Sequence, residues 1–250
     1  AILSAVKASK ADLSSAQLTG ATADGGDFSE ADFQAADVSE AVFTGAVLDG
    51  ASFAGATAVD ADFSQADLCQ TSFHSANCEG MWLSSARAER IDFTGAVCVD
   101  LQIDATVAPH ATFTRADITT IRGGEGADLT GATFRAARGA DAVFESCRLD
   151  QSDFTEADLP GANFDRATLE QAVFAAADMP QARFDYANCR SAVFADANLF
   201  EAVFAGVELA EADIRRGNFY GVEFLDANVA QLVFQDANLR MTKLEQWTNR

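Results

Sequence analysis

A large apolar residue stands at every fifth position of this chain, and the residue two places before it is usually alanine. The pattern runs from Leu13 to Leu244 with one interruption, as in Ala-Asp-Phe at 31–33 and Ala-Asn-Leu at 197–199. A helix requires apolar residues three and four apart and a half-buried strand requires alternation, so neither element fits this spacing. The chain must turn at every repeat, which indicates a solenoid whose units bury their apolar sides by stacking.

A second period of twenty residues lies over the first. Phenylalanine recurs at this interval in three series, from Phe33 to Phe113, from Phe134 to Phe194 and from Phe144 to Phe224, while leucine and smaller apolar residues hold the pentads between them. A coil of four pentads would therefore place phenylalanine on two opposite inner faces. About a dozen coils at roughly 4.8 Å each would form one elongated domain about 60 Å long, which we expect to comprise residues 1–250.

The Ala-Asp/Asn-Leu/Phe motif, repeated in tandem over nearly the whole chain, resembles the pentapeptide-repeat family. The resemblance implies an all-β fold, namely a right-handed quadrilateral parallel β-helix with about twenty residues per coil. It also implies that the large residue and the alanine two places before it both point inward.

The fivefold spacing fails once, within residues 119–128, where the central residues Ile118 and Leu129 stand eleven apart instead of ten. One residue is therefore inserted, which divides the repeats into 1–118 and 129–244, and the two halves need not share an axis. Glycine tolerates the positive φ that kinks often need, so we expect a bulge or a short binding loop here. The segment consists of Arg122, Gly123, Gly124, Glu125 and Gly126.

The core pattern also weakens from about residue 78 to residue 125. Central positions there carry small residues such as Cys78 and Ala88, whereas the normally small positions carry Met81 and Ile91. This exchange of volume keeps a core filled, but we expect the coils to be less regular. Pro109 should add to the irregularity, because proline cannot donate to a hydrogen-bonded ladder.

The chain carries a formal net charge of −21 at neutral pH. Phosphate binding needs clustered lysine and arginine, whereas the arginines here are interspersed among carboxylates, so direct binding of nucleic acid is not expected. The acidic surface would attract a basic protein or one that normally binds DNA. Acidity also serves solubility by itself, and both interpretations stay open.

Catalytic and metal-binding patterns are absent from the sequence. The five cysteines include no CxxC pair, and their usage fits a reducing, cytoplasmic compartment. Cys78 and Cys98 stand one coil apart, which allows two buried thiols or a disulfide. His74 and His110 follow no metal-ligand spacing and should lie on the surface. We expect no enzyme activity and no cofactor, and neither a signal peptide nor an apolar run that could span a membrane is present.

Large apolar residues at normally polar positions mark the candidate partner surface, which consists of Phe200, Tyr220, Tyr186 and Trp82. Phe200 and Tyr220 are one coil apart and should stack on the outside of the rod. Exposed aromatic columns mark protein interfaces, although such stacking can also be purely stabilising. Asparagine at 198, 218 and 238 predicts a hydrogen-bonded ladder.

The two ends of the sequence lead to further expectations. The repeat is already running at residue 1, so we expect a further domain before it. Residues 245–250 leave the pattern, and Trp247 could cover the last coil as a lid.

The resemblance implies two candidate functions. Some family members bind DNA gyrase and protect it from quinolones or peptide toxins by resembling duplex DNA in charge and width, and they typically dimerise through a C-terminal helix that this chain lacks. Others are C-terminal parts of larger bacterial proteins, including adaptors associated with type VI secretion, and the uninterrupted alanine-rich repeats here look similar to these. We expect a non-catalytic protein-interaction scaffold, with gyrase-directed DNA mimicry as the alternative and the oligomeric state open.

Overall fold

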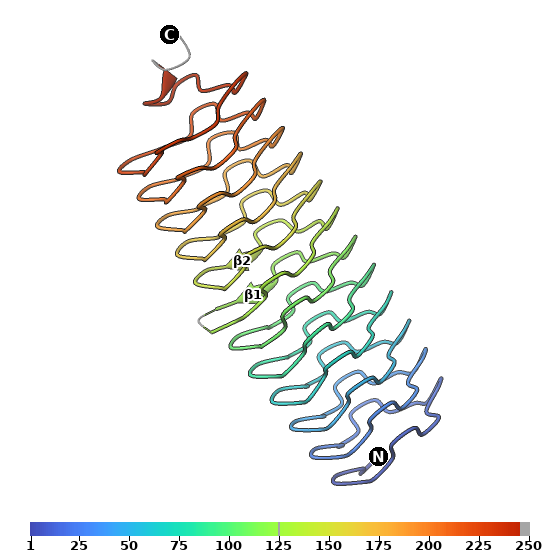
Figure 1. Cartoon of the computed structure of the whole chain (residues 1–250). Helices are drawn as coiled ribbons and strands as arrows, with labels where there is room; N and C mark the ends of the chain where they lie inside the picture. The colour runs from blue at the N-terminus through green and yellow to red at the C-terminus, as the bar shows by residue number, and fades with distance from the viewer. Residues whose placement is uncertain (125, 246–250) are drawn as a thin grey trace.

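The computed structural model describes residues 1–124 and 126–245. The chain winds into one continuous rod of stacked coils, with the two termini at opposite ends (Figure 1). Each coil has four short straight segments joined by four corners. The fold is the right-handed quadrilateral parallel β-helix that the resemblance implies. Among the described residues no helix has the length and apolar character needed to cross a membrane.

Each pentad has five structurally distinct positions, which we number 1 to 5 and illustrate with residues 31–35. Position 1 (Ala31) and position 3 (Phe33) point inward and are buried, position 2 (Asp32) points outward, and positions 4 and 5 form the corner. The N–H of the following residue donates to the position-3 carbonyl, as from Ala36 to Phe33 at 3.0 Å. Position 5 has a positive φ in every described pentad. These are the features of a type II turn.

Parallel backbone hydrogen bonds join each coil to the next. Within a pentad the N–H groups at positions 2, 3 and 5 donate to neighbouring coils, as Asp32 donates to Ala11 O at 2.9 Å and Phe33 to Ser52 O at 2.7 Å. The N–H at position 4 takes no part in this ladder. It donates instead to the position-2 side chain, as Gln34 N does to Asp32 Oδ1 at 2.9 Å, which explains why aspartate and asparagine recur there.

The expected effect of Pro109 is therefore wrong. Pro109 stands at position 4, and the ladder on either side of it is intact, with Ala108 N donating to Asp128 O at 2.8 Å and His110 N to Thr130 O at 2.9 Å. The expected irregularity of the surrounding coils is not found either. Bridged residues remain twenty apart from residue 62 to residue 122, because a small central residue such as Cys78 is offset by the large Met81 at the next position 1, and both are buried.

The phenylalanine series form two ladders on opposite inner faces, as predicted. Rings in successive coils stack, as Phe33 and Phe53 do with centroids 4.5 Å apart and planes at 4°. Rings from opposite faces meet edge to face, as Phe43 and Phe53 do at 6.0 Å and 85°. Both arrangements are favourable for aromatic quadrupoles. One ladder continues from Phe33 to Phe194, whereas on the opposite face non-aromatic residues separate Phe63 from Phe144.

The ladder that contains Phe33 and Phe53 also crosses the irregular segment. Strands β1 (Arg122–Gly123) and β2 (Val143–Phe144) pair in parallel there, and the spacing of bridged residues changes from twenty to twenty-one. Phe113 nevertheless stacks on Phe134 at 4.9 Å and 2°. The extra residue is thus accommodated at one corner, and 1–118 and 129–244 form one stack with a shared core.

The remaining expectations for the core concern the thiols and the chain end. Cys78 and Cys98 are both free and buried, and burial, then the neighbouring Cys78, raises the pKa of the Cys98 thiol well above its ordinary value. Trp247 and residues 246–250 lie outside the described residues, so a lid over the last coil stays a prediction.

Candidate interaction surface

The four aromatic residues of the candidate partner surface all lie on or beside one face of the rod. We call it the aromatic face and define it by the outward column at position 2 that contains Trp82, Arg183, Val203 and Glu223. Phe200 and Tyr220 belong to the corner that leads into this face, and Tyr186 belongs to the corner that leaves it.

Phe200 and Tyr220 stack on the outside as expected, with ring centroids 5.5 Å apart and planes at 7°. Phe200 is 36% exposed. The predicted asparagine ladder is present beside them, because Asn218 Nδ2 donates to Asn198 Oδ1 at 2.8 Å and Asn238 Nδ2 donates to Asn218 Oδ1 at 2.8 Å. The same Oδ1 atoms accept the N–H groups of Phe200 and Tyr220. The asparagine ladder therefore fixes the backbone positions of Phe200 and Tyr220 along the rod.

Tyr186 and Leu225 lie at the opposite edge of the aromatic face, where they are 68% and 42% exposed. The ring of Tyr186 lies along the corner of the next coil, since a Cβ built at Gly206 would be 2.6 Å from its Cδ1 atom. Five apolar residues within three coils thus form one surface, which we call the C-terminal patch. It consists of Tyr186, Phe200, Val203, Tyr220 and Leu225.

Trp82 is not part of the C-terminal patch. It is 50% exposed, but it lies five coils from Arg183 toward the N-terminus. The structure therefore brings together three of the four aromatic residues and separates the fourth.

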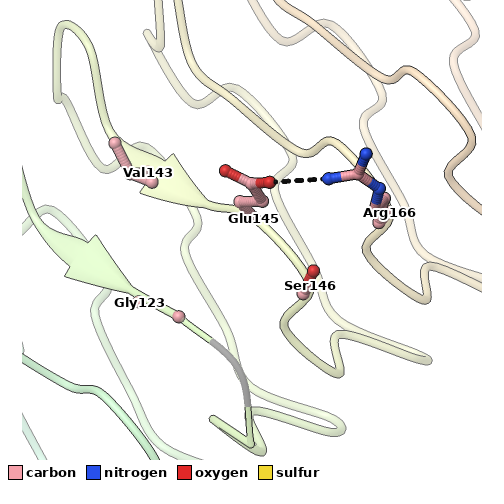
Figure 2. Close-up of a pocket in the computed structure, with 6 residues that line it drawn as sticks. Gly123, Val143, Glu145, Ser146 and Arg166 are labelled. Atoms are coloured by element: carbon pink, nitrogen blue, oxygen red, sulfur yellow. Dashed lines mark hydrogen bonds and ion pairs between the residues drawn. The ribbon is translucent and has the colours of Figure 1, made fainter.

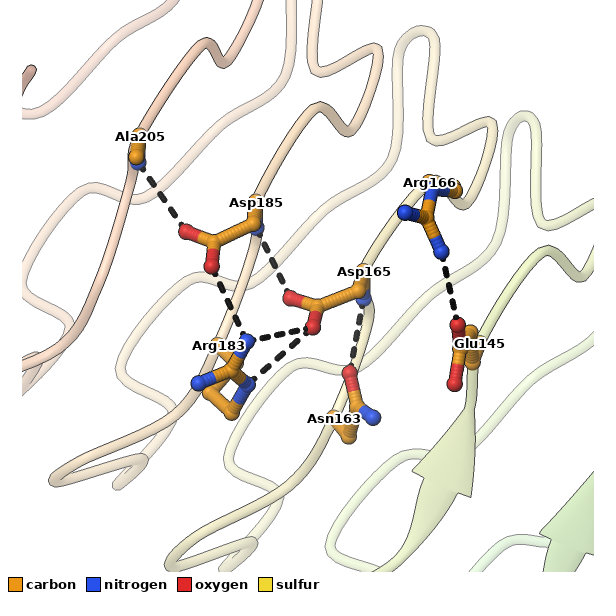
Figure 3. Close-up of polar contacts among 7 residues, drawn as sticks. All are labelled: Glu145, Asn163, Asp165, Arg166, Arg183, Asp185 and Ala205. Carbon is orange, nitrogen blue, oxygen red and sulfur yellow. Dashed lines mark hydrogen bonds and ion pairs between the residues drawn. The ribbon is translucent and has the colours of Figure 1, made fainter.

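Arg183 lies in the middle of the aromatic face and is held by two carboxylates (Figure 3). Its Nη2 donates to Asp165 Oδ2 at 2.7 Å and to Asp185 Oδ2 at 2.9 Å. The hydrogen bond to Asp165 raises the pKa of the Arg183 guanidinium, so the cation persists and is matched by the anions around it.

The same aspartates supply the acceptors that Arg183 and Val203, the position-2 residues of two successive coils, cannot provide. Asp185 N donates to Asp165 Oδ1 at 2.9 Å, and Ala205 N donates to Asp185 Oδ1 at 3.1 Å. The position-4 N–H groups of these pentads thus find partners one coil away, as Figure 3 shows. This network makes the Tyr186 edge of the C-terminal patch rigid.

A hollow of about 400 Å³ opens beside the irregular segment (Figure 2). Arg166 Nη1 lies 3.1 Å from Glu145 Oε1 at its rim. The hollow is lined by Gly123, Gly124, Val143, Glu145, Ser146 and Arg166. The last four follow the repeat pattern, so the sequence carries no signal that distinguishes them.

The glycines of the irregular segment have packing roles. Arg122 and Gly123 form β1, and a Cβ at Gly123 would be 2.7 Å from Cys147 Sγ. A Cβ at Gly124 would be 2.5 Å from Asp104 Oδ1, and Gly126 has a φ of 84°. Glu125 lies outside the described residues, so its part in a bulge or binding loop stays a prediction.

The described residues offer surfaces for binding, with few groups suited to catalysis. No group of three potential metal ligands occurs among them, and His74 and His110 are exposed on different coils. Burial raises the pKa of the Cys147 thiol, which lies beneath the hollow, to about 12. That thiol stays protonated and is a poor nucleophile.

Comparisons with known proteins agree with the repeat architecture. The sequence matches the family model described as pentapeptide repeats in eight overlapping copies, which together cover residues 1–87, 125–175 and 182–224. No curated protein matches the chain in sequence.

Several solved structures are similar to the chain. HetL from the cyanobacterium Nostoc sp. strain PCC 7120, a pentapeptide repeat protein involved in heterocyst differentiation regulation, is 20% identical, with 92% of this chain and 89% of that chain covered and a TM-score of 0.32. Full-length QnrB1, a plasmid-mediated fluoroquinolone resistance protein, is 18% identical, with 82% and 89% covered and a TM-score of 0.38. Rfr23 from the cyanobacterium Cyanothece 51142 is 15% identical, with 46% and 89% covered and a TM-score of 0.35.

Proposed function

Because the chain belongs to the pentapeptide-repeat family, whose members are generally structural or interaction proteins, we propose that it is a non-catalytic scaffold that binds a protein partner. The contact surface is the C-terminal patch. The observation that carries this proposal is the outward stack of Phe200 on Tyr220. Aromatic side chains held in fixed positions lose little conformational entropy on binding, and they are enriched at interfaces.

The position of the patch supports the proposal. Positions 2, 4 and 5 face water in the other coils and are mostly polar, whereas three consecutive coils here carry large apolar side chains at those positions. Tyr186 covers a glycine corner and leaves 68% of its surface in water, which a role in stability alone does not require. The proposed setting is the cytoplasm, where the five free cysteines stay reduced.

Site-specific crosslinking tests the proposal. A photoreactive phenylalanine analogue in place of Tyr220 should crosslink one defined protein in cells, whereas the same analogue at Gln171, on a different edge of the rod, should not. Replacing both Phe200 and Tyr220 with serine should abolish that product from a probe at Leu225 without lowering the cooperativity of unfolding. Equal labelling from Gln171 and Tyr220, or loss of folding in the serine variant, would contradict the proposal.

The second candidate is mimicry of DNA toward gyrase. It is favoured by the charge of −21 on a straight rod and by carboxylates that recur along one corner of the rod, with Gly80 and Thr120 between them. These carboxylates include Glu40, Asp60, Asp100 and Asp141. This function predicts a dimer that alters DNA supercoiling by gyrase, and a monomer without effect at micromolar concentration would exclude it. An adaptor role in type VI secretion stays a prediction from the family resemblance.

A further inference from the structure

Three carboxylates beside the C-terminal patch have no cationic partner among the described residues, and they differ from the other unpaired carboxylates of the rod in lying next to its outward apolar side chains. Glu201, Glu223 and Asp226 are exposed, and their side chains form no ion pair or hydrogen bond with any described residue. Other arginines of these coils are already engaged. The pairs are Arg190 with Glu211, Arg215 with Asp213 and Arg216 with Asp196.

The three carboxylates alternate with the apolar residues of the patch. Glu201 follows Phe200, and its Cγ lies 3.3 Å from a Cβ built at Gly221, next to Tyr220. Glu223 and Asp226 stand on either side of Leu225 and its buried neighbour. An unpaired carboxylate therefore lies beside each of Phe200, Tyr220 and Leu225.

We propose that the C-terminal patch binds an extended segment of a partner protein in which arginine or lysine alternates with aromatic or other large apolar residues. This inference rests on the function proposed above and specifies the chemistry of the occupant. Apolar side chains of the segment cover Phe200, Tyr220 and Leu225 and remove them from water. Cationic side chains pair with the free carboxylates, and a guanidinium also stacks on the exposed face of an aromatic ring.

Charge on the aromatic face disfavours an acidic occupant. The charge of Arg183 is offset by Asp165 and Asp185 at 2.7 and 2.9 Å. Arg240, one coil beyond Tyr220 at the same corner, has no ion pair within the described part of the chain. The groups around the patch are thus two guanidinium groups, those of Arg183 and Arg240, and five carboxylates, those of Asp165, Asp185, Glu201, Glu223 and Asp226. An acidic occupant would place like charges opposite each other at the interface, which costs free energy.

A second copy of the chain is a poor occupant for the same reason. Each copy carries a net charge of −21, so two patches facing each other would bring two acidic surfaces together. The same consideration favours a basic segment, because the field of the whole rod adds to local pairing and speeds the encounter.

Peptide binding tests the inference directly. The probe is a fluorescent ten-residue peptide of alternating arginine and tryptophan, compared with a glutamate–tryptophan peptide and an arginine–serine peptide. We expect only the first to bind the whole chain well at low salt. The variant E201Q/E223Q/D226N should bind it about tenfold more weakly, since three exposed ion pairs together contribute about 1–2 kcal/mol.

A charge-matched variant serves as the control. D49N/E156Q/E170Q removes three carboxylates from other edges of the rod and should change the affinity less than about twofold, because long-range field effects are screened by salt. Both variants keep side-chain shape at exposed sites, so their thermal unfolding should match that of the parent chain.

The outcomes separate this inference from the proposed function. Equal binding of the arginine–tryptophan peptide to the two triple variants, or equal binding of the glutamate–tryptophan peptide, overturns the cationic segment while leaving an apolar docking surface in place. If no peptide binds and the Tyr220 probe still crosslinks a partner, the segment chemistry is wrong and the scaffold function stands. Loss of the crosslink as well removes the scaffold function itself.

Discussion

The side chain at one inward position limits the size of the residue two places before it. Gly26 stands at position 1, where alanine is usual, and a Cβ there would lie 2.4 Å from Cε2 of Phe28. Gly217 and Phe219 repeat the relation, with a distance of 2.6 Å. Phe28 and Phe219 are on the two inner faces that are otherwise lined by leucine and smaller residues, so the larger ring is accommodated by the absence of a methyl group.

Gly26→Ala should therefore destabilise the protein by about 1–3 kcal/mol, the usual cost of overpacking. Adding Phe28→Leu should recover most of that loss, because leucine leaves room for the methyl group. Urea denaturation of the two single variants and the double variant measures the coupling. Additive effects in this cycle would mean that the ring of Phe28 moves aside freely.

Ser152 is a buried polar residue whose hydroxyl has no hydrogen-bond partner among the residues that the structure describes. It is fully buried at position 1, whereas Thr71 at the same kind of position donates from Oγ1 to Leu48 O at 2.8 Å. An unsatisfied buried group costs about 1–3 kcal/mol. Ser152→Ala should raise the free energy of unfolding by about 1 kcal/mol, and Thr71→Ala should lower it. A loss of stability in Ser152→Ala would indicate that the hydroxyl is hydrogen-bonded in solution.

The pentad is the structural element of this fold, and the sequence predicts its inward positions better than its hydrogen bonding. The spacing of Phe33 and Phe53 was sufficient to predict stacked ladders, because only burial explains such regular apolar spacing. The spare N–H at position 4 could not be predicted in this way, since it is a property of backbone geometry. For that reason Pro109 appeared disruptive, although it removes a donor that the ladder does not use.

Proline should therefore be tolerated at position 4 and excluded at position 2. Val99 is at position 4, and Val97 at position 2 of the same pentad offers no side-chain acceptor for the Val99 N–H. Val99→Pro should leave stability unchanged or raise it by up to about 1 kcal/mol. Val97→Pro should lower it by about 3 kcal/mol or more, since Val97 N donates to Ala76 O at 2.9 Å. Thermal unfolding of the pair measures the contrast, and equal losses would refute the role given to position 4.

The aspartates at position 2 make the corners sensitive to acid. Hydrogen bonds from the Ser39 hydroxyl and N–H, and from Thr19, lower the pKa of Asp37. Ser14 and Ser29 lower the pKa values of Asp12 and Asp27 in the same way. A carboxylate whose pKa is lower in the folded than in the unfolded state stabilises the fold above its unfolded pKa, and this contribution is lost as the pH falls through the folded-state value.

Asparagine accepts the same N–H without titrating. The variant D12N/D27N/D37N should therefore lose less stability than the parent chain as the pH falls below about 4, when both are unfolded with urea at a series of pH values. Asp49→Asn, at a corner position without these hydrogen bonds, provides the control. Parallel curves for the triple variant and the parent chain would show that the position-2 carboxylates do not govern acid sensitivity.

Across the whole molecule, the sequence predicts well which residues stack along the rod from one coil to the next. It predicts poorly which residues of different corners lie side by side on one face. The period of twenty predicted the stack of Phe200 on Tyr220, because both residues occupy one corner. It did not reveal that Tyr186 faces the same patch from the other edge, although it does place Trp82 five coils away. The hollow was missed because most of the residues that line it, such as Glu145, obey the repeat.

The net charge of −21 should act in opposite directions on folding and on binding. Mutual repulsion along the rod destabilises the compact state, while the exposed ion pairs contribute little. Raising NaCl from about 10 to 150 mM shortens the Debye length from about 30 to 8 Å, so the melting temperature at pH 7 should rise. The same screening should weaken binding of the arginine–tryptophan peptide. The variant D49N/E156Q/E170Q has less repulsion to screen, so its melting temperature should rise less. A fall in melting temperature with added salt would contradict this prediction. It would mean that the ion pairs outweigh the repulsion and that the acidic surface is chiefly a stabilising network.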